Sequence, residues 1–195
     1  CARLNRYGLL SVSGTEARDF LHAQLTIDIQ NLPPERAALA GWCSAKGRLL
    51  ATLLVIPAPQ GFLLQLARDL APAVAKRLSM FVLRSKVKVA DVSDAWAQVG
   101  LWGEERPQPR GLYGVSRESD AVFVCMGDKR YLSIVPAAQA AAGTASEEAW
   151  ALEEIRAGRP LITAATQDQF VPQMVNFVAL GGIDFQKGCY PGQEI

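Results

Sequence analysis

Short apolar runs alternate with turn residues along the chain, a pattern typical of a protein built from short strands and amphipathic helices. Residues 8–12 are mostly apolar and predict a strand. The residues that follow, Ser13-Gly14-Thr15-Glu16, have the composition of a capping box, so we expect a helix to begin there. The apolar side chains on the inner face of that helix are Ala17, Phe20, Leu21 and Leu25.

Three β-type runs come next, at residues 37–43, 48–56 and 62–67. Because short turns join them, the sequence predicts an antiparallel meander. A helix over residues 70–81 follows, and residues 84–92 alternate like a further strand. The apolar positions on one face of the predicted helix are Leu70, Val74, Leu78 and Phe81.

The second part of the chain predicts strands at residues 97–102, 121–126 and 131–135. A helix should begin near Ser146 and end at Gly158, since glycine commonly follows the last turn of a helix. Strands and helices are therefore segregated rather than strictly alternating. This order favours an α+β fold of antiparallel sheets with packed helices.

Residues 108–114 are best interpreted as a connector between two α+β halves. We accordingly expect a first α+β half over residues 1–110 and a second over residues 111–195. The chain starts at Cys1 and stops directly behind its most distinctive motif. Both ends are expected to be truncations of a longer polypeptide.

The composition argues against several classes of function. The net charge is +1 and the basic residues are dispersed, so the basic patch typical of a nucleic-acid binder is missing. The apolar runs are too short to span a bilayer, which argues against a membrane protein. The spacing of the cysteines suits neither a zinc site nor a disulfide scaffold and predicts a reducing, cytoplasmic setting without a bound metal. These cysteines are Cys1, Cys43, Cys125 and Cys189.

The stretch from 187 to 194, Lys-Gly-Cys-Tyr-Pro-Gly-Gln-Glu, is the densest collection of functional groups in the chain. Gly188 and Gly192 permit unusual backbone angles, and the proline between them restricts the loop. Cys189 is the side chain that such a loop would present. Lys187, two residues earlier, would favour the thiolate, which is the reactive form of cysteine. The alternative is a tight turn whose cysteine fills a small apolar space.

This motif resembles the signature of the YgfZ proteins, folate-binding relatives of the glycine-cleavage aminomethyltransferase, or T-protein. The resemblance extends upstream to Val171-Pro172-Gln173-Met174-Val175-Asn176 and to Leu180-Gly181-Gly182-Ile183. It is also seen near the start of the chain, in Ser13-Gly14-Thr15-Glu16-Ala17 with Phe20 and Gln24, and in Ala45-Lys46-Gly47-Arg48.

The resemblance implies a T-protein-like fold arranged as a ring around a central opening, with a C-terminal β-barrel expected to be missing from this chain. It implies tetrahydrofolate, or a one-carbon derivative of it, as the cofactor. Tyr7 and Trp150 match positions of folate-contacting aromatics, although either ring has an ordinary place in a core. Arg48, with Lys46, is a candidate for the glutamate tail. Gln193 and Glu194 complete the cofactor-binding set.

Two departures separate this chain from the aminomethyltransferases it resembles. Those enzymes carry an acidic pair where this chain has Leu49-Leu50-Ala51-Thr52-Leu53. They also carry a glutamate that recognises the amidine edge of the pterin where this chain has Arg156. If a carboxylate recognises the pterin in this chain, it must come from Glu153, Glu154 or Glu194. Aminomethyl transfer is therefore disfavoured, and an accessory folate-binding protein is favoured over an enzyme.

The resemblance further implies a role in assembling or repairing iron–sulfur clusters of client enzymes, including enzymes that modify tRNA. Cys189 would be the functional thiol, assisted by Lys187, because thiolate is a soft ligand suited to iron–sulfur chemistry. We expect a monomer that contacts its clients without binding RNA. A one-carbon transferase and a non-catalytic folate-binding scaffold remain the alternatives. A cysteine hydrolase would need His22, the only histidine, beside Cys189.

Overall fold

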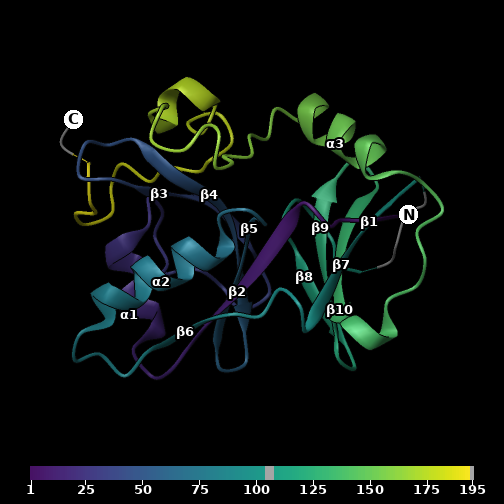
Figure 1. Cartoon of the computed structure of the whole chain (residues 1–195), viewed down its shortest axis with the longest axis horizontal. Helices are drawn as coiled ribbons and strands as arrows, with labels where there is room; N and C mark the ends of the chain where they lie inside the picture. The colour runs from purple at the N-terminus through teal and green to yellow at the C-terminus, as the bar shows by residue number, and fades with distance from the viewer. Residues whose placement is uncertain (104–107, 194–195) are drawn as a thin grey trace.

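Two five-stranded antiparallel sheets pack against each other in the computed structural model, which describes residues 1–103 and 108–193 (Figure 1). The first sheet has the order β3-β4-β5-β2-β6 and the second the order β1-β7-β10-β9-β8. Helices α1 and α2 lie on the first sheet, and α3 lies beside the second (Figure 1). The α+β class predicted from the sequence is confirmed.

The first sheet confirms the predicted meander. Its strands are β2 (Tyr7–Ser13), β3 (Ala38–Cys43), β4 (Leu49–Ala58), β5 (Gly61–Ala67) and β6 (Lys88–Asp91). Consecutive strands β3, β4 and β5 pair antiparallel through short turns, and β2 then pairs with both β5 and β6. Helices α1 (Ala17–Gln24) and α2 (Ala71–Val82) follow their predicted positions within a few residues.

The second sheet is formed by β1 (Ala2–Arg3), β7 (Trp96–Trp102), β8 (Val115–Glu118), β9 (Ala121–Gly127) and β10 (Arg130–Pro136). A 3-10 turn (Ala137–Gln139) leads toward α3 (Glu147–Arg156), and Gly158 follows that helix with a φ of +67°. A second 3-10 turn (Pro172–Val175) lies in the long final segment. That segment crosses the ends of β3 and β4 (Figure 1).

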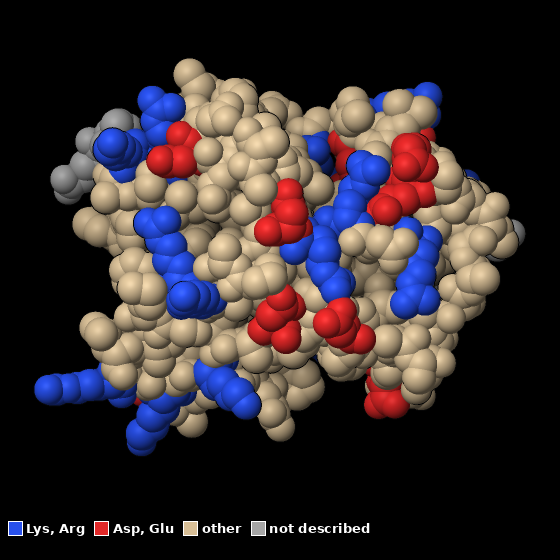
Figure 2. All heavy atoms as spheres, in the orientation of Figure 1, with Lys and Arg blue, Asp and Glu red and all other residues tan. Residues whose placement is uncertain are grey.

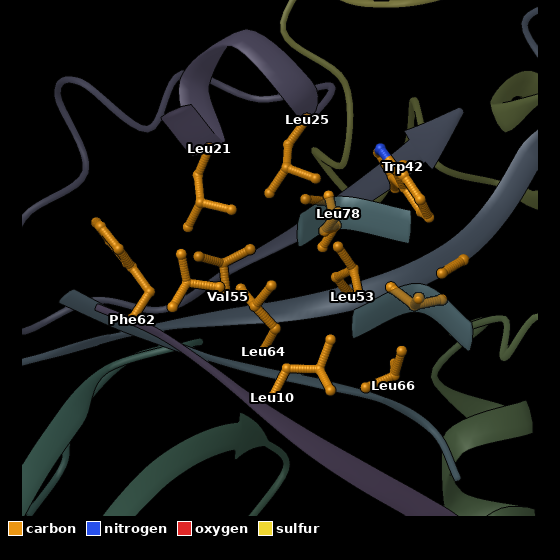
Figure 3. Close-up of a cluster of buried hydrophobic side chains, with 14 of the residues drawn as sticks. Leu10, Leu21, Leu25, Trp42, Leu53, Val55, Phe62, Leu64, Leu66 and Leu78 are labelled. Carbon is orange, nitrogen blue, oxygen red and sulfur yellow. The ribbon is translucent and has the colours of Figure 1, made fainter. Parts of the chain in front are cut away.

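The first sheet is buried on both faces, because one face meets the helices and the other meets the second sheet. Toward the helices, Leu10 and Leu64 pack with Leu21 of α1 and Leu78 of α2 (Figure 3). Toward the second sheet, the neighbouring residue Leu9 belongs to a separate cluster. Nearly every residue of β4 is therefore buried, which explains why its sequence is a continuous apolar run.

Helix α1 begins without the predicted capping box. Glu16 occupies the N-cap position, but its side chain makes no capping bond. Its carboxylate instead accepts a hydrogen bond from the backbone N–H of Lys86 at 2.6 Å, so a tertiary contact replaces the local one. The predicted inward face is correct, since Ala17, Phe20 and Leu21 are buried.

Three other predictions need correction. Phe81 is 45% exposed, because Val82 rather than Phe81 continues the buried face of α2 beyond Val74 and Leu78. The strand predicted over 84–92 is limited to β6, which pairs only with β2. Strands β1 and β8 were missed, since the first has two residues and the second is largely polar.

The chain passes from one sheet to the other between β6 and β7. The final segment then returns to the first sheet, where Leu49 N donates to Phe170 O at 2.7 Å and Asp168 N donates to Leu49 O at 2.9 Å. Each sheet thus contains or contacts residues from both ends of the chain. The division into halves at residue 110 stays a prediction.

Candidate functional site

A cavity of about 160 Å³ lies between the two sheets, beneath α3. Strand β2 contributes Tyr7, β4 contributes Thr52, and β5 contributes Gln65. Helix α3 contributes Glu154, and the segment after it contributes Arg159. Figure 2 shows acidic and basic side chains gathered along the junction between the two halves of the molecule on one face. The cavity therefore combines apolar strand residues with a few fixed polar groups, as small-molecule sites commonly do.

Glu154 is held by two buried arginines. Its Oε1 accepts hydrogen bonds from Arg130 Nη1 at 3.1 Å and from Arg159 Nη2 at 2.5 Å, and its Oε2 accepts one from Arg159 Nε at 3.0 Å. The carbonyl oxygen of Met126 accepts further bonds from both guanidinium groups. Burial lowers the pKa of Arg159, but the Glu154 carboxylate outweighs it and the net shift is upward. This network joins α3 to β9 and β10 and to the segment that follows α3.

Tyr7 is the predicted aromatic that does line the cavity. Its side chain is 8% exposed, and burial raises the pKa of its hydroxyl, with the Glu154 carboxylate adding to the shift. Tyr7 therefore remains a neutral phenol throughout the physiological range. Arg6, the preceding residue, also lines the cavity. Its side chain is 41% exposed and is paired with Glu147 at 3.5 Å and with Glu148 at 3.9 Å.

Trp150 occupies a different place from the one expected of a ligand-stacking ring. It is 2% exposed, and the face of its indole lies so close to Gly100 that a Cβ there would come within 2.3 Å of it. Its ring centroid is 5.9 Å from that of Trp102. Ala151, the next residue, lines the cavity instead. Trp150 thus packs α3 onto the second sheet behind the cavity wall.

The run that replaces the acidic pair of the aminomethyltransferases also reaches the cavity. Thr52 lines it, and its Oγ1 accepts a hydrogen bond from Ile162 N at 3.1 Å. Among the other candidate carboxylates, Glu153 pairs with Arg156 outside the lining, at 2.6 Å. Glu194 lies outside the described residues. Glu154 is thus the carboxylate that the described residues bring to the cavity.

Lys187 anchors the loop that carries the cysteine motif. Its Nζ donates hydrogen bonds to the carbonyl oxygens of His22 at 2.6 Å and Leu25 at 2.9 Å, at the C-terminal end of α1. A cation there also complements the negative end of the helix dipole. The same Nζ lies 4.9 Å from the centre of the Tyr190 ring. Burial lowers the pKa of Lys187, while Asp184, Asp28 and Cys189 act in the opposite direction.

The structure brings the two glycine-containing motifs into direct contact. A Cβ built on Gly192 would lie 2.4 Å from Ser44 O and 2.5 Å from backbone atoms of Gly47. Gly192 also has a φ of +81°, so both its space and its backbone angle favour glycine. Gln193 closes the turn, because its Oε1 accepts from Tyr190 N at 3.3 Å and its N–H donates to Tyr190 O at 3.2 Å.

The thiol of Cys189 is exposed, whereas that of Cys43 is buried. Burial raises the pKa of Cys43 to about 12. Cys43 in turn adds to the upward shift that burial imposes on the pKa of Tyr190, so the buried thiol lies close to the motif loop. His22 does not complete a hydrolase dyad in the described contacts, since its Nδ1 faces Asp28 Oδ1 at 3.2 Å.

Arg48 serves the final segment rather than the cavity. Its exposed guanidinium donates from Nη1 to Gln169 O at 2.8 Å. Lys46 is exposed in the same turn. Both belong to the end of the first sheet where Gly47 meets the motif loop. Their predicted role at the glutamate tail of folate stays a prediction.

Four residues of the cavity region were missed from the sequence. A single amide interrupts each of two apolar strands, Gln65 in β5 and Gln98 in β7, and such isolated polar residues signal a buried hydrogen bond. Arg130 was missed because its partner, Glu154, comes from a separate element, and their proximity depends on the packing of α3. Arg159 pairs with Glu154 from just beyond the end of α3, where the helical spacing of side chains no longer applies.

Comparison with known proteins shows which proteins the chain is related to. No family model matches it. A curated tRNA-modifying protein YgfZ from Edwardsiella ictaluri is 32% identical over 99% of the chain, and one from Klebsiella pneumoniae is 30% identical over 98%. The chain is a homologue of the YgfZ proteins. It spans 64% of the length of each of these YgfZ relatives.

Solved structures confirm the T-protein-like fold of this YgfZ homologue. The aminomethyltransferase T of the glycine cleavage system from Bartonella henselae superposes with a TM-score of 0.61 at 18% identity, covering 78% of this chain and 44% of that one. A heterotetrameric sarcosine oxidase from Corynebacterium gives a TM-score of 0.50 at 17% identity, covering 70% and 74% respectively.

Two further findings concern the described part of the chain. It contains no helix long and apolar enough to cross a membrane. Residues 1–103 and 108–193 also bring no group of three or more His, Cys, Asp or Glu side chains together at a distance suited to a metal ion.

Proposed function

We propose that this protein binds tetrahydrofolate in the cavity between its sheets and serves an accessory role in tRNA modification. The observation that carries the proposal is the cavity itself, set between two antiparallel sheets in a fold shared with an aminomethyltransferase. The name of the YgfZ relatives supports the connection to tRNA modification. We propose that this activity takes place in the cytoplasm and involves no direct contact with RNA.

The residues present fit one end of a folate. Pockets for drug-sized ligands enclose roughly 300–1,000 Å³, so a cavity of about 160 Å³ takes a fused ring rather than the whole molecule. Tyr7 and Leu54 offer it flat or apolar contact. Arg6 is suited to the anionic glutamate tail if the tail replaces its present partners, Glu147 and Glu148. Bound folate would supply one-carbon chemistry, whereas the protein binds and orients it.

An accessory role is favoured over aminomethyl transfer by the state of Glu154. It is the carboxylate among the residues that line the cavity, and both of its oxygens already accept hydrogen bonds from arginines. A carboxylate fixed in this way is a poor general base, because its lone pairs face guanidinium N–H groups. Thr52, in the run compared with the acidic pair, offers only a hydroxyl.

Cys189 is proposed to be the functional thiol for iron–sulfur clusters of client enzymes. Its exposure and the glycine contact that fixes its loop support this role. The thiol does not line the folate cavity. Folate binding and thiol chemistry are therefore two separable properties of one molecule.

The ligand and its site can be tested together by calorimetric titration of tetrahydrofolate into the intact protein. Ala151→Trp should abolish the binding heat, because an indole at this position would fill the cavity. Leu152→Trp is the matched control, since Leu152 is the next residue on α3 and is 46% exposed. Equal heats for the parent and both variants would contradict the assignment of the site.

A complementation assay tests the thiol. Cys189→Ser should leave the binding heat unchanged and abolish support of iron–sulfur client enzymes in cells that lack the endogenous protein. Cys1→Ser provides the control, because Cys1 is a free, half-buried thiol far from the motif in sequence. Full client activity with Cys189→Ser would refute the thiol role and leave the folate site untouched.

A further inference from the structure

Two buried amides connect the sheets beside the cavity. Gln65 lies on β5 of the first sheet and Gln98 on β7 of the second. Their side chains are 7% and 4% exposed. Gln65 Nε2 donates a hydrogen bond to Gln98 Oε1 at 2.7 Å. Gln65 lines the cavity under discussion, while Gln98 lines a second hollow on the other side of the pair.

The orientation of the Gln98 amide is determined by the backbone of β2. Its Nε2 donates to the carbonyl oxygens of Tyr7 at 3.3 Å and Gly8 at 3.1 Å. The reverse orientation would direct the amide oxygen at two carbonyl oxygens, with no hydrogen atom between them. The oxygen of Gln98 must therefore face Gln65.

The orientation of Gln65 follows from that of Gln98. Since Gln98 presents an acceptor, Gln65 must present its nitrogen, and its Oε1 is the atom left for the cavity. Within the described residues, no donor forms a hydrogen bond with this oxygen. Gln65 Oε1 is also absent from the buried atoms that lack a partner, which is consistent with its access to the cavity space.

Two other side chains of the cavity already accept hydrogen bonds from the protein. Both oxygens of Glu154 accept from arginines, and Thr52 Oγ1 accepts from a backbone N–H. Gln65 Oε1 is thus a side-chain acceptor of the cavity that has no protein donor among the described residues. A ligand that offers an N–H group to this oxygen gains a hydrogen bond, and a ligand that offers a lone pair or a methyl group does not.

We propose that Gln65 selects ligands that carry an N–H edge on a flat heterocycle, and that Gln98 is the positioning residue that fixes this preference. The inference rests on the proposed function, since it assigns the cavity to the ring end of a folate. The N–H edge is the chemical feature of the ligand that the cavity would recognise. Gln98 acts only through Gln65, because its own polar atoms are bonded to Gln65 and to the β2 backbone.

The test compares two bicyclic probes as competitors of tetrahydrofolate. Pterin carries N–H groups on its pyrimidine edge, whereas 1,3-dimethyllumazine carries methyl groups and none. The parent should prefer pterin by roughly tenfold, in line with the larger estimates for one neutral hydrogen bond. Gln65→Leu should remove that preference by weakening pterin and not dimethyllumazine. Gln98→Leu should reduce the preference, because the Gln65 amide is then free to turn.

The outcomes separate this inference from the proposed function. Failure of the parent to bind tetrahydrofolate would overturn both. Binding by the parent with the same probe preference in Gln65→Leu would overturn the inference alone. A merely structural role of Gln65 would weaken both probes equally, which would also overturn it. Gln60→Leu, an exposed amide in the turn before β5, should behave like the parent.

Discussion

The cavity between the sheets and the cysteine motif loop are built on opposite principles. Around the cavity, charged side chains bind one another, so that Glu154, Arg130 and Arg159 form a buried ionic cluster. In the motif loop, one side chain, Lys187, binds backbone oxygens of α1, and Gly192 lies against backbone atoms. Removing one member of the cluster leaves buried charges, whereas altering the loop releases a local contact. The first region should therefore govern stability and the second should govern presentation of the thiol.

The sharpest way to expose this difference is Glu154→Ala. It should lower the free energy of unfolding by about 3–5 kcal/mol, because two buried guanidinium groups lose their counter-charge. Urea denaturation measures the effect. Glu153→Ala, which breaks a more exposed pair with Arg156, should cost less than about 1 kcal/mol. Similar costs for the two variants would contradict the view that the cavity network is structural.

Lys187→Met should have an intermediate effect. The variant loses two charge-assisted hydrogen bonds at the end of α1, which predicts a loss of about 2 kcal/mol in unfolding free energy. Tetrahydrofolate binding should be unchanged, because Lys187 is remote from the cavity lining. Lys46→Met, at an exposed turn, is the control. Loss of folate binding in Lys187→Met would show that the two regions are coupled.

Gly192→Ala should cost about 1–2 kcal/mol through a strained backbone angle and a clash with Ser44 O and Gly47. Its larger consequence should be functional, because the loop must move away from the turn at Gly47. The activity of the iron–sulfur client enzymes should fall in cells that carry the variant, while the binding heat of tetrahydrofolate persists. Gly188→Ala is a suitable comparison, since a Cβ at Gly188 meets nothing within 4 Å among the described residues. Equal client support in both variants would argue against the glycine contact.

The last expected effect on stability is absent at neutral pH, because it is a dependence on alkaline pH that comes from Cys43. The folded state raises the pKa of this thiol from 9.0 to about 12, so folding favours the protonated form. That stabilisation is complete below pH 9 and declines as the pH rises from 9 toward 12, since the unfolded thiol ionises first. Unfolding curves of the parent and Cys43→Ala should converge over this range. A constant difference between them would contradict the burial of the thiol.

Alkylation at pH 8 distinguishes the same two thiols kinetically. Cys189 should react in the folded protein, and Cys43 should react only after unfolding, because its thiol is buried and protonated. Mass spectrometry of the labelled peptides gives the two rates. Protection of Cys189 in the native protein would remove the basis for its role as a presented thiol.

Local patterns predicted most of the fold because they depend on one element at a time. The apolar run of β4 and the spacing of Val74 and Leu78 in α2 both reflect burial within a single element. Phe81 was misplaced because the spacing of apolar residues does not decide whether Phe81 or its neighbour Val82 completes the buried face of α2, which is a tertiary property. The capping box was wrong for the same reason, since Lys86 competes for the Glu16 carboxylate.

The site was harder to predict than the fold. The motif made Cys189 and Lys187 site candidates, and their role stays a prediction. The anchoring of Lys187 to α1 could not be predicted, because its partners His22 and Leu25 are 165 and 162 positions away in the sequence. Tyr7 was expected at the ligand and lines the cavity, whereas Trp150 packs behind its wall. The orientation of the Gln65 amide is fixed only by its hydrogen bond to Gln98, on the other sheet. Chemistry that depends on contacts between sheets cannot be predicted from either strand alone.

The central claim is that folate binding and thiol presentation belong to separate regions of one molecule. Side-by-side titration of tetrahydrofolate into the parent, Ala151→Trp and Cys189→Ser tests it most directly. The account predicts binding heat for the parent and for Cys189→Ser, with the same dissociation constant, and none for Ala151→Trp. Retention of the heat in Ala151→Trp, or its loss in Cys189→Ser, would contradict the claim.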